Sequence, residues 1–432
     1  MRLFFLGHWK IYLKEFELLA LWLHWKKELP FTLFCVSTAA ISLFATQSIT
    51  LWSPVKARVF IVFLCLLPAI ATLLQEKYGF LSPCPQKISG KWFFLLSGLG
   101  GVNVIFSHDP WASLKGVVIL LIGGILAAYC ASRVLNTEKK IFIFSCLLTF
   151  LLWFLCLAGL WELQINPNSR NPLRFFYQNP IPSGAMLVLY SLGPLLLVSS
   201  KKKPLQIDWI LYGLIIFAFT YLLLMLKKGP LLSCVVAITL GVIWGRPNLG
   251  RLVPLLLLPL TFVLVYSLSL TSDDFDFFFH FHGILVRLEL WKLGLSVFEV
   301  YPLQGYGFNS SLLEFVRADY QTWLYYANNG ISFVDYFSRV NALDNMLLTF
   351  LAELGLMFFL AYCFFLRSIL KCWFKGLGLK NFSTPEKMVS LVLIAILIQS
   401  LTFDVLKFPD LSWMWHTVLT LGPSIRNSRA GG

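Results

Sequence analysis

The hydrophobic and polar positions of this chain fall in blocks, because long apolar runs are separated by short polar connections. Continuous apolar runs of roughly 17–25 residues are typical of helices that cross a bilayer. They favour helices over an outer-membrane barrel, whose strands alternate apolar and polar positions. The pattern predicts twelve spans, of which the third, eighth and last are the shortest: 30–51, 56–74, 92–107, 113–132, 141–161, 181–199, 207–226, 229–245, 251–270, 343–366, 387–404 and 409–422.

The composition agrees with this pattern. The 432 residues are 58% hydrophobic and 13% charged, with a mean hydropathy of +0.75. A soluble globular domain is closer to a quarter charged, so the surroundings of most of this chain are lipid. We therefore predict an all-α polytopic membrane protein with membrane lipids as partners.

Basic residues predict how the spans are oriented. With the N-terminus inside, most of the 35 lysines and arginines lie in inside connections, as the positive-inside rule requires. Lys201–Lys203, Lys139–Lys140 and the connection 367–387 are the clearest cases. The net charge of +14 is then a topology signal and an attraction to anionic lipids, and it does not indicate nucleic-acid binding.

This orientation divides the chain into five segments. Residues 1–29 precede the first span, 30–270 hold spans one to nine, 271–342 form one large outward-facing loop, 343–422 hold spans ten to twelve, and 423–432 are an inside tail. A loop as long as the third segment usually carries function.

The first segment lacks the small-residue cleavage site of a secretory signal. Its mixture of lysines, glutamates, aromatics and leucines over residues 3–27 suits an interfacial amphipathic helix on the inside surface. A basic leader that only sets orientation is an equal alternative. In the loop, Leu285, Leu288, Leu295 and Phe298 fall near helical spacing, which predicts a helix there.

Metal and disulfide chemistry find little support. The nine cysteines lie mostly in spans, none lies in the loop, and none forms a C-x-x-C pair. An acidic and histidine-rich stretch at the start of the loop resembles a divalent-metal cluster, but a solvated loop start is favoured for its residues, Asp273, Asp274, Asp276, His280 and His282. His416, in the last span, is predicted to be a hydrogen-bonded structural histidine rather than a proton carrier.

Charges near the outer edges of the spans are the candidates for binding. Lys227 and Lys228 lie between two spans on the outside, against the topology rule, so they form either an anion site or a pair of snorkelling lysines. Arg170, Arg174 and Arg287 are further outward cations. Together these side chains could surround a phosphate group.

The tenth span carries its own polar pattern. Asn345, Thr349 and Glu353 are spaced by four, so we expect one polar stripe that faces protein, with Glu353 protonated and hydrogen-bonded to a neighbouring helix. Asp344 stands at the rim, where water can reach it. The spacing favours Asp344 as the helix N-cap, and a general base is the alternative.

Two motifs resemble those of a known family. The segment V-R-L-E-L-W-K-L-G-L-S-V-F-E-V-Y-P-L-Q-G-Y-G-F and the later D-N-M-L-L-T-F-L-A-E-L-G resemble the O-antigen ligase and polymerase superfamily (WaaL and Wzy-like membrane proteins). The similarity spans residues 284 to about 366, and more weakly the twelve-span plan. The residues that carry it are Arg287, Trp291, Gly294, Pro302, Gly305, Gly307, Asn345, Glu353 and Gly355.

The resemblance implies a ligase of the bacterial inner membrane, with both termini cytoplasmic and the large loop in the periplasm. Such a ligase transfers a glycan from undecaprenyl pyrophosphate to a sugar hydroxyl of lipid A-core, with inversion, without a metal and without another cofactor. Arg287 and Lys228 match the family's pyrophosphate-binding positions, with Lys227, Arg170 and Arg174 assisting. Asp344 stands where the family has its proposed base, a histidine.

Both matches depart from the family pattern. A lysine replaces a fork-shaped guanidinium at position 228, and an aspartate is a weaker proton acceptor than a histidine at position 344. Three alternatives therefore stand beside the ligase. A polymerase would use the same donor, a transporter of lipid-linked glycans would show broken helices and repeats, and a membrane scaffold would have lost the activity.

Overall fold

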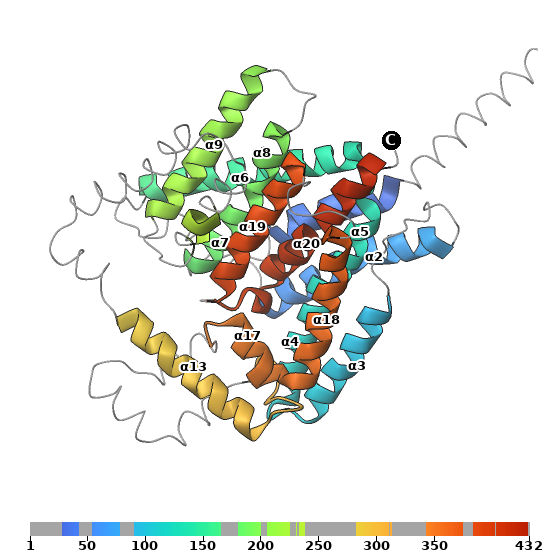
Figure 1. Cartoon of the computed structure of the whole chain (residues 1–432), viewed down its shortest axis with the longest axis vertical. Coiled ribbons are helices and arrows are strands. Elements are labelled where there is room, and N and C mark those ends of the chain that lie inside the picture. Colours follow the sequence, from blue (N-terminus) through green and yellow to red (C-terminus); the bar gives the residue numbers. More distant parts are fainter. Residues whose placement is uncertain are drawn as a thin grey trace, which may run out of the picture.

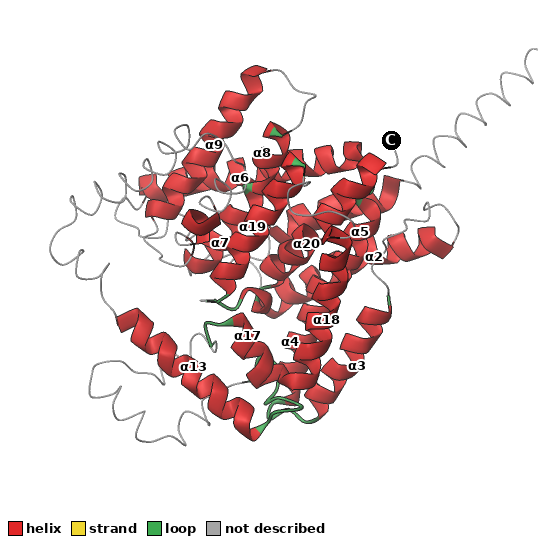
Figure 2. Cartoon of the chain, viewed as in Figure 1, coloured by secondary structure: helices red, strands yellow, loops and turns green. Residues whose placement is uncertain are grey.

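The computed structural model describes residues 28–42, 54–77, 90–165, 180–199, 205–224, 230, 233–237, 282–310, 312, 343–374, 383–401 and 403–430. Within these ranges the chain is helical and contains no strand, so the all-helical prediction is confirmed for them (Figure 2). The predicted interfacial helix before residue 28 and most of the spans 229–245 and 251–270 lie outside the described residues.

The described helices follow one another along the chain with short connections, and two of them, η1 and η3, are π-helical turns. In order they are the helix Glu28–Ser42, α2 (Pro54–Lys77), α3 (Lys91–Ile105), α4 (Pro110–Leu120), η1 (Leu121–Ile125), α5 (Leu126–Val134), α6 (Glu138–Ile165), α7 (Pro180–Tyr190), α8 (Leu192–Val198), α9 (Leu205–Leu224), α13 (His282–Val300), α17 (Met346–Thr349), η3 (Phe350–Leu354), α18 (Gly355–Phe374), α19 (Thr384–Ser400), η5 (Val405–Lys407) and α20 (Pro409–Ala430).

Three helical stretches are long and apolar enough to cross a membrane: Pro110–Val134, Glu138–Ile165 and Met346–Lys371. The other described spans coincide with shorter apolar helices. Large apolar side chains stand exposed on these helices, among them Phe94 at 76% and Trp209 at 78%. A protein surrounded by water does not usually tolerate such a surface, so the chain is a membrane protein by the composition of its helices and of their outer faces.

The last helix, α20, lies at the centre of the bundle (Figure 1) and packs against α5, α18 and α19. Trp413 and Trp415 on it are completely buried. Its hydropathy is low because it carries serines and threonines, but Thr417 and Ser424 donate hydrogen bonds to carbonyls of their own helix. The helix continues to Ala430, beyond the predicted end at 422, so the weakest sequence signal belongs to the most enclosed helix.

Ionic contacts join the connections at one end of the bundle. Glu28 pairs with Lys140 at 3.3 Å, Glu76 with Arg133 at 2.5 Å, and Glu386 with Arg426 at 2.9 Å. All of these residues belong to connections, or to helix ends next to them, that the lysine and arginine pattern assigns to the inside.

A second set of contacts joins connections that the same pattern assigns to the outside. The His108 amide donates to the Tyr306 carbonyl at 3.0 Å, and the Leu343 amide donates to Asp404 at 3.2 Å. Lys407 contacts Glu353 at 2.6 Å. The alternation of ends along the chain is therefore internally consistent.

The helix predicted in the large loop is present as α13, which stands beside α17 at the lower edge of Figure 1. Its predicted apolar stripe does not face the core, because Leu288 and Leu295 are 43% and 49% exposed. Leu290 and Val297 are the fully buried positions. The helix packs through that face on α17 and η3, forming a small core separate from the main one.

Candidate functional site

The two motifs of the sequence, about forty residues apart, pack directly against each other. Residues 301–310, which we call the glycine turn, lie against the point where the tenth predicted span is interrupted at Gly355 (Figure 2, green loops beside α18). The amides of Tyr306 and Gly307 donate to the carbonyls of Ala352 and Glu353, each at 2.9 Å. Beyond the interruption, the Leu356 amide donates to the Pro302 carbonyl at 2.8 Å.

Glycine is required on both sides of this contact. Gly355 has φ +81°, and a side chain there would overlap the Leu303 carbonyl oxygen. Gly305 has φ +73°, and its side chain would overlap the Glu353 carbonyl oxygen. Only a residue without Cβ allows the two backbones to approach this closely in these conformations. The glycines of both motifs therefore serve one backbone interface.

Asn103, a lone polar residue in α3, completes this interface. Its amide nitrogen donates to the carbonyls of Gln304 and Glu353, both at 2.7 Å. Its oxygen accepts from the Ser113 hydroxyl at 2.9 Å and from the Phe308 amide at 3.0 Å. The side chain is buried with all of its main bonding capacity used, so it joins α3, α4, the glycine turn and η3.

Glu353 is fully buried and has a cationic partner. Lys407 Nζ lies 2.6 Å from its Oε1, and the Asn309 amide donates to its Oε2 at 2.7 Å. The prediction placed Glu353 beside protein, which is correct, but expected a protonated acid bonded to a neutral group. The ammonium and the amide are instead two donors that favour the charged carboxylate.

Asp404 occupies the other side of the same helix start. Thr349 donates its hydroxyl to Asp404 Oδ1 at 2.7 Å, and the Leu343 amide donates to Oδ2 at 3.2 Å. Asn345, Thr349 and Glu353 are all buried, so the predicted stripe does face protein. Asp404 is the acid that satisfies its middle member.

Asp344 is not the helix cap that its spacing favoured. Asn345 is the N-cap of α17, since its side chain accepts from the amides of Leu347 and Leu348 at 3.0 and 3.2 Å. Asp344 precedes the cap with φ +51°, a conformation that aspartate and asparagine adopt more readily than most residues. It is also 6% exposed rather than open at the rim. Its carboxylate therefore takes no part in capping α17 and is held in a nearly closed site.

Arg287 reaches this carboxylate from α13. Its Nε lies 3.9 Å from Asp344 Oδ2, which makes an ion pair but is too long for a hydrogen bond. Gly294, two turns along the same helix face, permits close approach, because a Cβ there would lie 3.0 Å from Leu343 Cδ1. Trp291 lies between them on the same face and packs against the small core.

The structure thus brings together every motif residue except those outside its described ranges. Arg170, Arg174, Lys227 and Lys228 are in that excluded group, as are Asp273, Asp274, Asp276 and His280. Within the described ranges, no group of three histidine, cysteine, aspartate or glutamate side chains is placed to hold a metal ion. Sequence reasoning missed Asn103, Asp404 and Lys407. A single asparagine in an apolar run, and an acid three residues before a lysine in a short connection, were the available signals.

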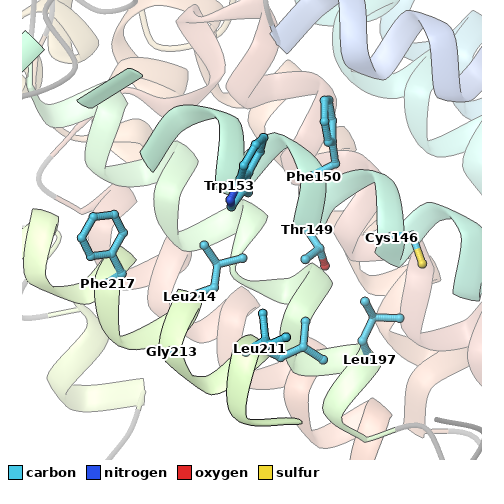
Figure 3. A pocket seen from close by; sticks show the side chains of 10 residues that line it. Cys146, Thr149, Phe150, Trp153, Leu197, Leu211, Gly213, Leu214 and Phe217 are labelled. Atoms are coloured by element: carbon cyan, nitrogen blue, oxygen red, sulfur yellow. The ribbon is translucent and has the colours of Figure 1, made fainter. Parts of the chain in front are cut away.

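An apolar groove of about 570 Å³ on the bundle is a different kind of feature (Figure 3). It lies between α6, α8 and α9, and its lining includes Phe150, Trp153, Leu211, Leu214 and Phe217. Its one hydroxyl, on Thr149, donates to the Ser145 carbonyl. The lining holds no acidic, basic or histidine side chain, so the groove is not a candidate active site.

His416 is buried and hydrogen-bonded, as predicted. Its Nδ1 lies 2.7 Å from the Ser412 carbonyl oxygen and must donate to it, so Nε2 accepts from the Tyr362 hydroxyl at 3.1 Å. Trp415 Nε1 donates to the same hydroxyl at 3.3 Å. These contacts fix a neutral tautomer in the core, away from the Arg287–Asp344 pair.

Fold and site define a class: an all-helical membrane protein in which an arginine–aspartate pair sits at the start of an interrupted helix. Comparison with known protein families and with curated proteins finds no match to this chain.

Proposed function

We propose that this protein is a membrane glycosyltransferase that moves a glycan from undecaprenyl pyrophosphate to a sugar hydroxyl of lipid A-core at the periplasmic face of the bacterial inner membrane. One observation carries the proposal. A guanidinium and a carboxylate, neither of which caps a helix, face each other at 3.9 Å beside a rigid backbone interface.

The charges around the pair are compatible with this chemistry. Glu353 is paired with Lys407, and Asp404 accepts from Thr349 and from the Leu343 amide. Asp344 is therefore the acid of this group that faces Arg287. Further positive charge for a pyrophosphate would come from Lys227, Lys228, Arg170 and Arg174, which the resemblance assigns to the same side.

In the proposed reaction the acceptor hydroxyl oxygen attacks the anomeric carbon of the donor sugar. The new glycosidic bond forms as the bond from that carbon to the pyrophosphate oxygen breaks. The hydroxyl proton passes to Asp344, and the electron pair leaves with undecaprenyl pyrophosphate, whose developing charge Arg287 stabilises. Inversion follows from attack opposite the leaving group, without a metal.

The gathering of predicted outside connections around the pair supports the orientation. The connection after α3, the glycine turn, the start of α17 and the connection before α20 all meet there. If the positive-inside rule sets the orientation, the pair opens toward the periplasm, and both termini are cytoplasmic.

A reconstituted assay tests the proposal. Purified protein in liposomes, supplied with an undecaprenyl-pyrophosphate-linked glycan and lipid A-core, should form the linked product in the presence of a metal chelator. Arg287→Ala should lower the rate by about 10²–10³-fold, because a donor to the leaving group is lost. Lys292→Ala, on the same helix, is the matched control and should retain activity. Wild-type protein that transfers to no acceptor, or Arg287→Ala with full activity, would contradict the proposal.

The acceptor decides between a ligase and a polymerase. A second undecaprenyl-pyrophosphate-linked chain should be offered in a parallel reaction. Product on lipid A-core supports the ligase, and elongation of the lipid-linked chain supports the polymerase, which shares the donor site.

A transporter of lipid-linked glycans is the second candidate, favoured by the interrupted helix at Gly355. In transporters such interruptions bind the substrate with freed backbone groups. Here the glycine turn and Asn103 take up the carbonyls of Ala352 and Glu353, which favours an enzyme scaffold. Movement of a labelled lipid-linked glycan across liposomes without any transfer product would support the transporter.

A further inference from the structure

One face of α13 meets residues 343–348 and carries a stripe of motif residues. Arg287, Trp291 and Gly294 are spaced by four and three, so they lie along one stripe of the helix. The close approach of Gly294 to Leu343 shows that this stripe faces the start of α17.

Two nitrogen atoms on this stripe are buried donors without an acceptor. Arg287 Nε and Trp291 Nε1 are both inaccessible, and neither has a hydrogen-bond partner in the part of the chain that the structure describes. Buried N–H groups are nearly always bonded in folded proteins, because leaving one unbonded costs the free energy of its lost hydration. The indole N–H can only donate, so its missing partner must be an acceptor.

Resting on the proposed function, we infer that Trp291 is a second binding residue for the donor substrate, and that its indole N–H bonds a phosphoryl oxygen of the pyrophosphate that Arg287 holds. Positions 287 and 291 are separated by about 6 Å along the helix at a rise of 1.5 Å per residue. Two linked phosphoryl groups can span that separation, whereas one phosphate held by Arg287 does not reach the second donor.

A donor role also accounts for a tryptophan at a packing position. The ring of Trp291 packs with the small core that contains Leu290 and Leu343, a role that phenylalanine could fill equally well. The indole nitrogen adds a neutral donor beside the guanidinium. Together they distinguish a pyrophosphate from a monophosphate, which matters because release of the monoester would be a different reaction.

Binding of geranylgeranyl pyrophosphate and geranylgeranyl phosphate to the full-length protein in detergent tests this inference. The wild type should bind the pyrophosphate about tenfold more tightly than the monophosphate, as one charge-assisted hydrogen bond allows. Trp291→Phe should remove that preference with the monophosphate Kd unchanged. Trp291→His, which keeps a ring N–H, should retain part of the preference. Trp209→Phe on α9, remote from α13 in Figure 1, is the matched control.

Failure of the inference is distinguishable from failure of the proposed function. If the wild type prefers the pyrophosphate, Arg287→Ala abolishes binding and Trp291→Phe leaves the preference intact, the inference is wrong and the donor site stands. If the wild type binds neither probe, both the inference and the proposed donor site are wrong.

Discussion

Asp344 and Asn345 divide two roles that one residue at a helix start can combine. Asn345 caps α17, while Asp344 is turned into the left-handed region beside Arg287. The carboxylate can therefore exchange a proton without loosening the helix. An acid at this position is separated from helix stability by a single residue.

We predict that Asp344→Asn abolishes transfer and leaves the fold unchanged. Asparagine tolerates the positive φ and the cap belongs to Asn345, so only the proton acceptor is lost. The rate should fall by about 10²–10⁴-fold, measured in the liposome assay. Asp344→His, which restores a base, should recover activity. Asp344→Asn with an unchanged rate would remove the base assignment, and a lowered melting temperature would show a structural role instead.

Asn103 is the residue whose loss should most disturb the site from a distance. Asn103→Ala removes a side chain that makes four hydrogen bonds among buried groups, so we expect destabilisation by about 2–3 kcal/mol. Thermal unfolding in detergent measures it. Gly98→Ala in the same helix is the control, since a Cβ there meets nothing within 4 Å. Equal melting temperatures for both variants would contradict the role of Asn103.

At the scale of elements, the tenth span is two helices joined end to end. α17 and η3 lead to Gly355, where the backbone turns before α18 begins. An interruption in a membrane helix exposes backbone groups that lipid cannot satisfy. The glycine turn satisfies them, so the large loop segment and the span are parts of one structural unit.

The glycine at the interruption is the element that should tolerate no side chain. Gly355→Ala forces a Cβ into the Leu303 carbonyl and strains a residue at φ +81°, so we expect loss of the folded site and of transfer. The cost should exceed about 1 kcal/mol, measured by thermal unfolding. Gly213→Ala in α9, where a Cβ meets open space, should remain close to wild type. Similar behaviour of the two variants would count against the interface.

At the scale of the whole molecule, a charged cluster ties three helices together at the end opposite the site. Glu386 accepts from Ser383 and from Arg426 Nε, and Arg426 also donates to the Trp373 carbonyl. Burial acts to raise the pKa of Glu386, but the hydrogen bonds from Ser383 and the nearby Arg426 outweigh it, so the pKa lies below its usual value.

This lowered pKa predicts a loss of stability in acid. A carboxyl with a depressed folded-state pKa stabilises the protein above its unfolded pKa of about 4.3, and the contribution disappears as the pH falls through the lower folded value. Melting temperatures between pH 7 and pH 3 should therefore fall more steeply for the wild type than for Glu386→Gln. At pH 7 the variant should be less stable by about 1 kcal/mol, since the capping box is weakened. Parallel curves would contradict the assignment.

Much of the architecture was predictable because membrane helices are encoded locally. Length and apolarity predicted most described helices, and glycine and asparagine spacing pointed to the start of α17. The buried face of α13 was not predictable, because Leu288 and Leu295 look like core residues until their neighbours are known. The roles of Asp404 and Lys407 were hidden for the same reason, since their partners Thr349 and Glu353 lie more than fifty residues away in the chain.

The sequence by itself determined that this is a helical membrane protein, which helices it contains and which two motifs carry polar chemistry, because each of these depends on residues close together in the chain. Only the tertiary structure decided that Asn345 caps the helix while Asp344 faces Arg287, and that the glycines of both motifs share one backbone interface. Those outcomes depend on close approach between distant segments, where a carbonyl or a methylene either fits or does not.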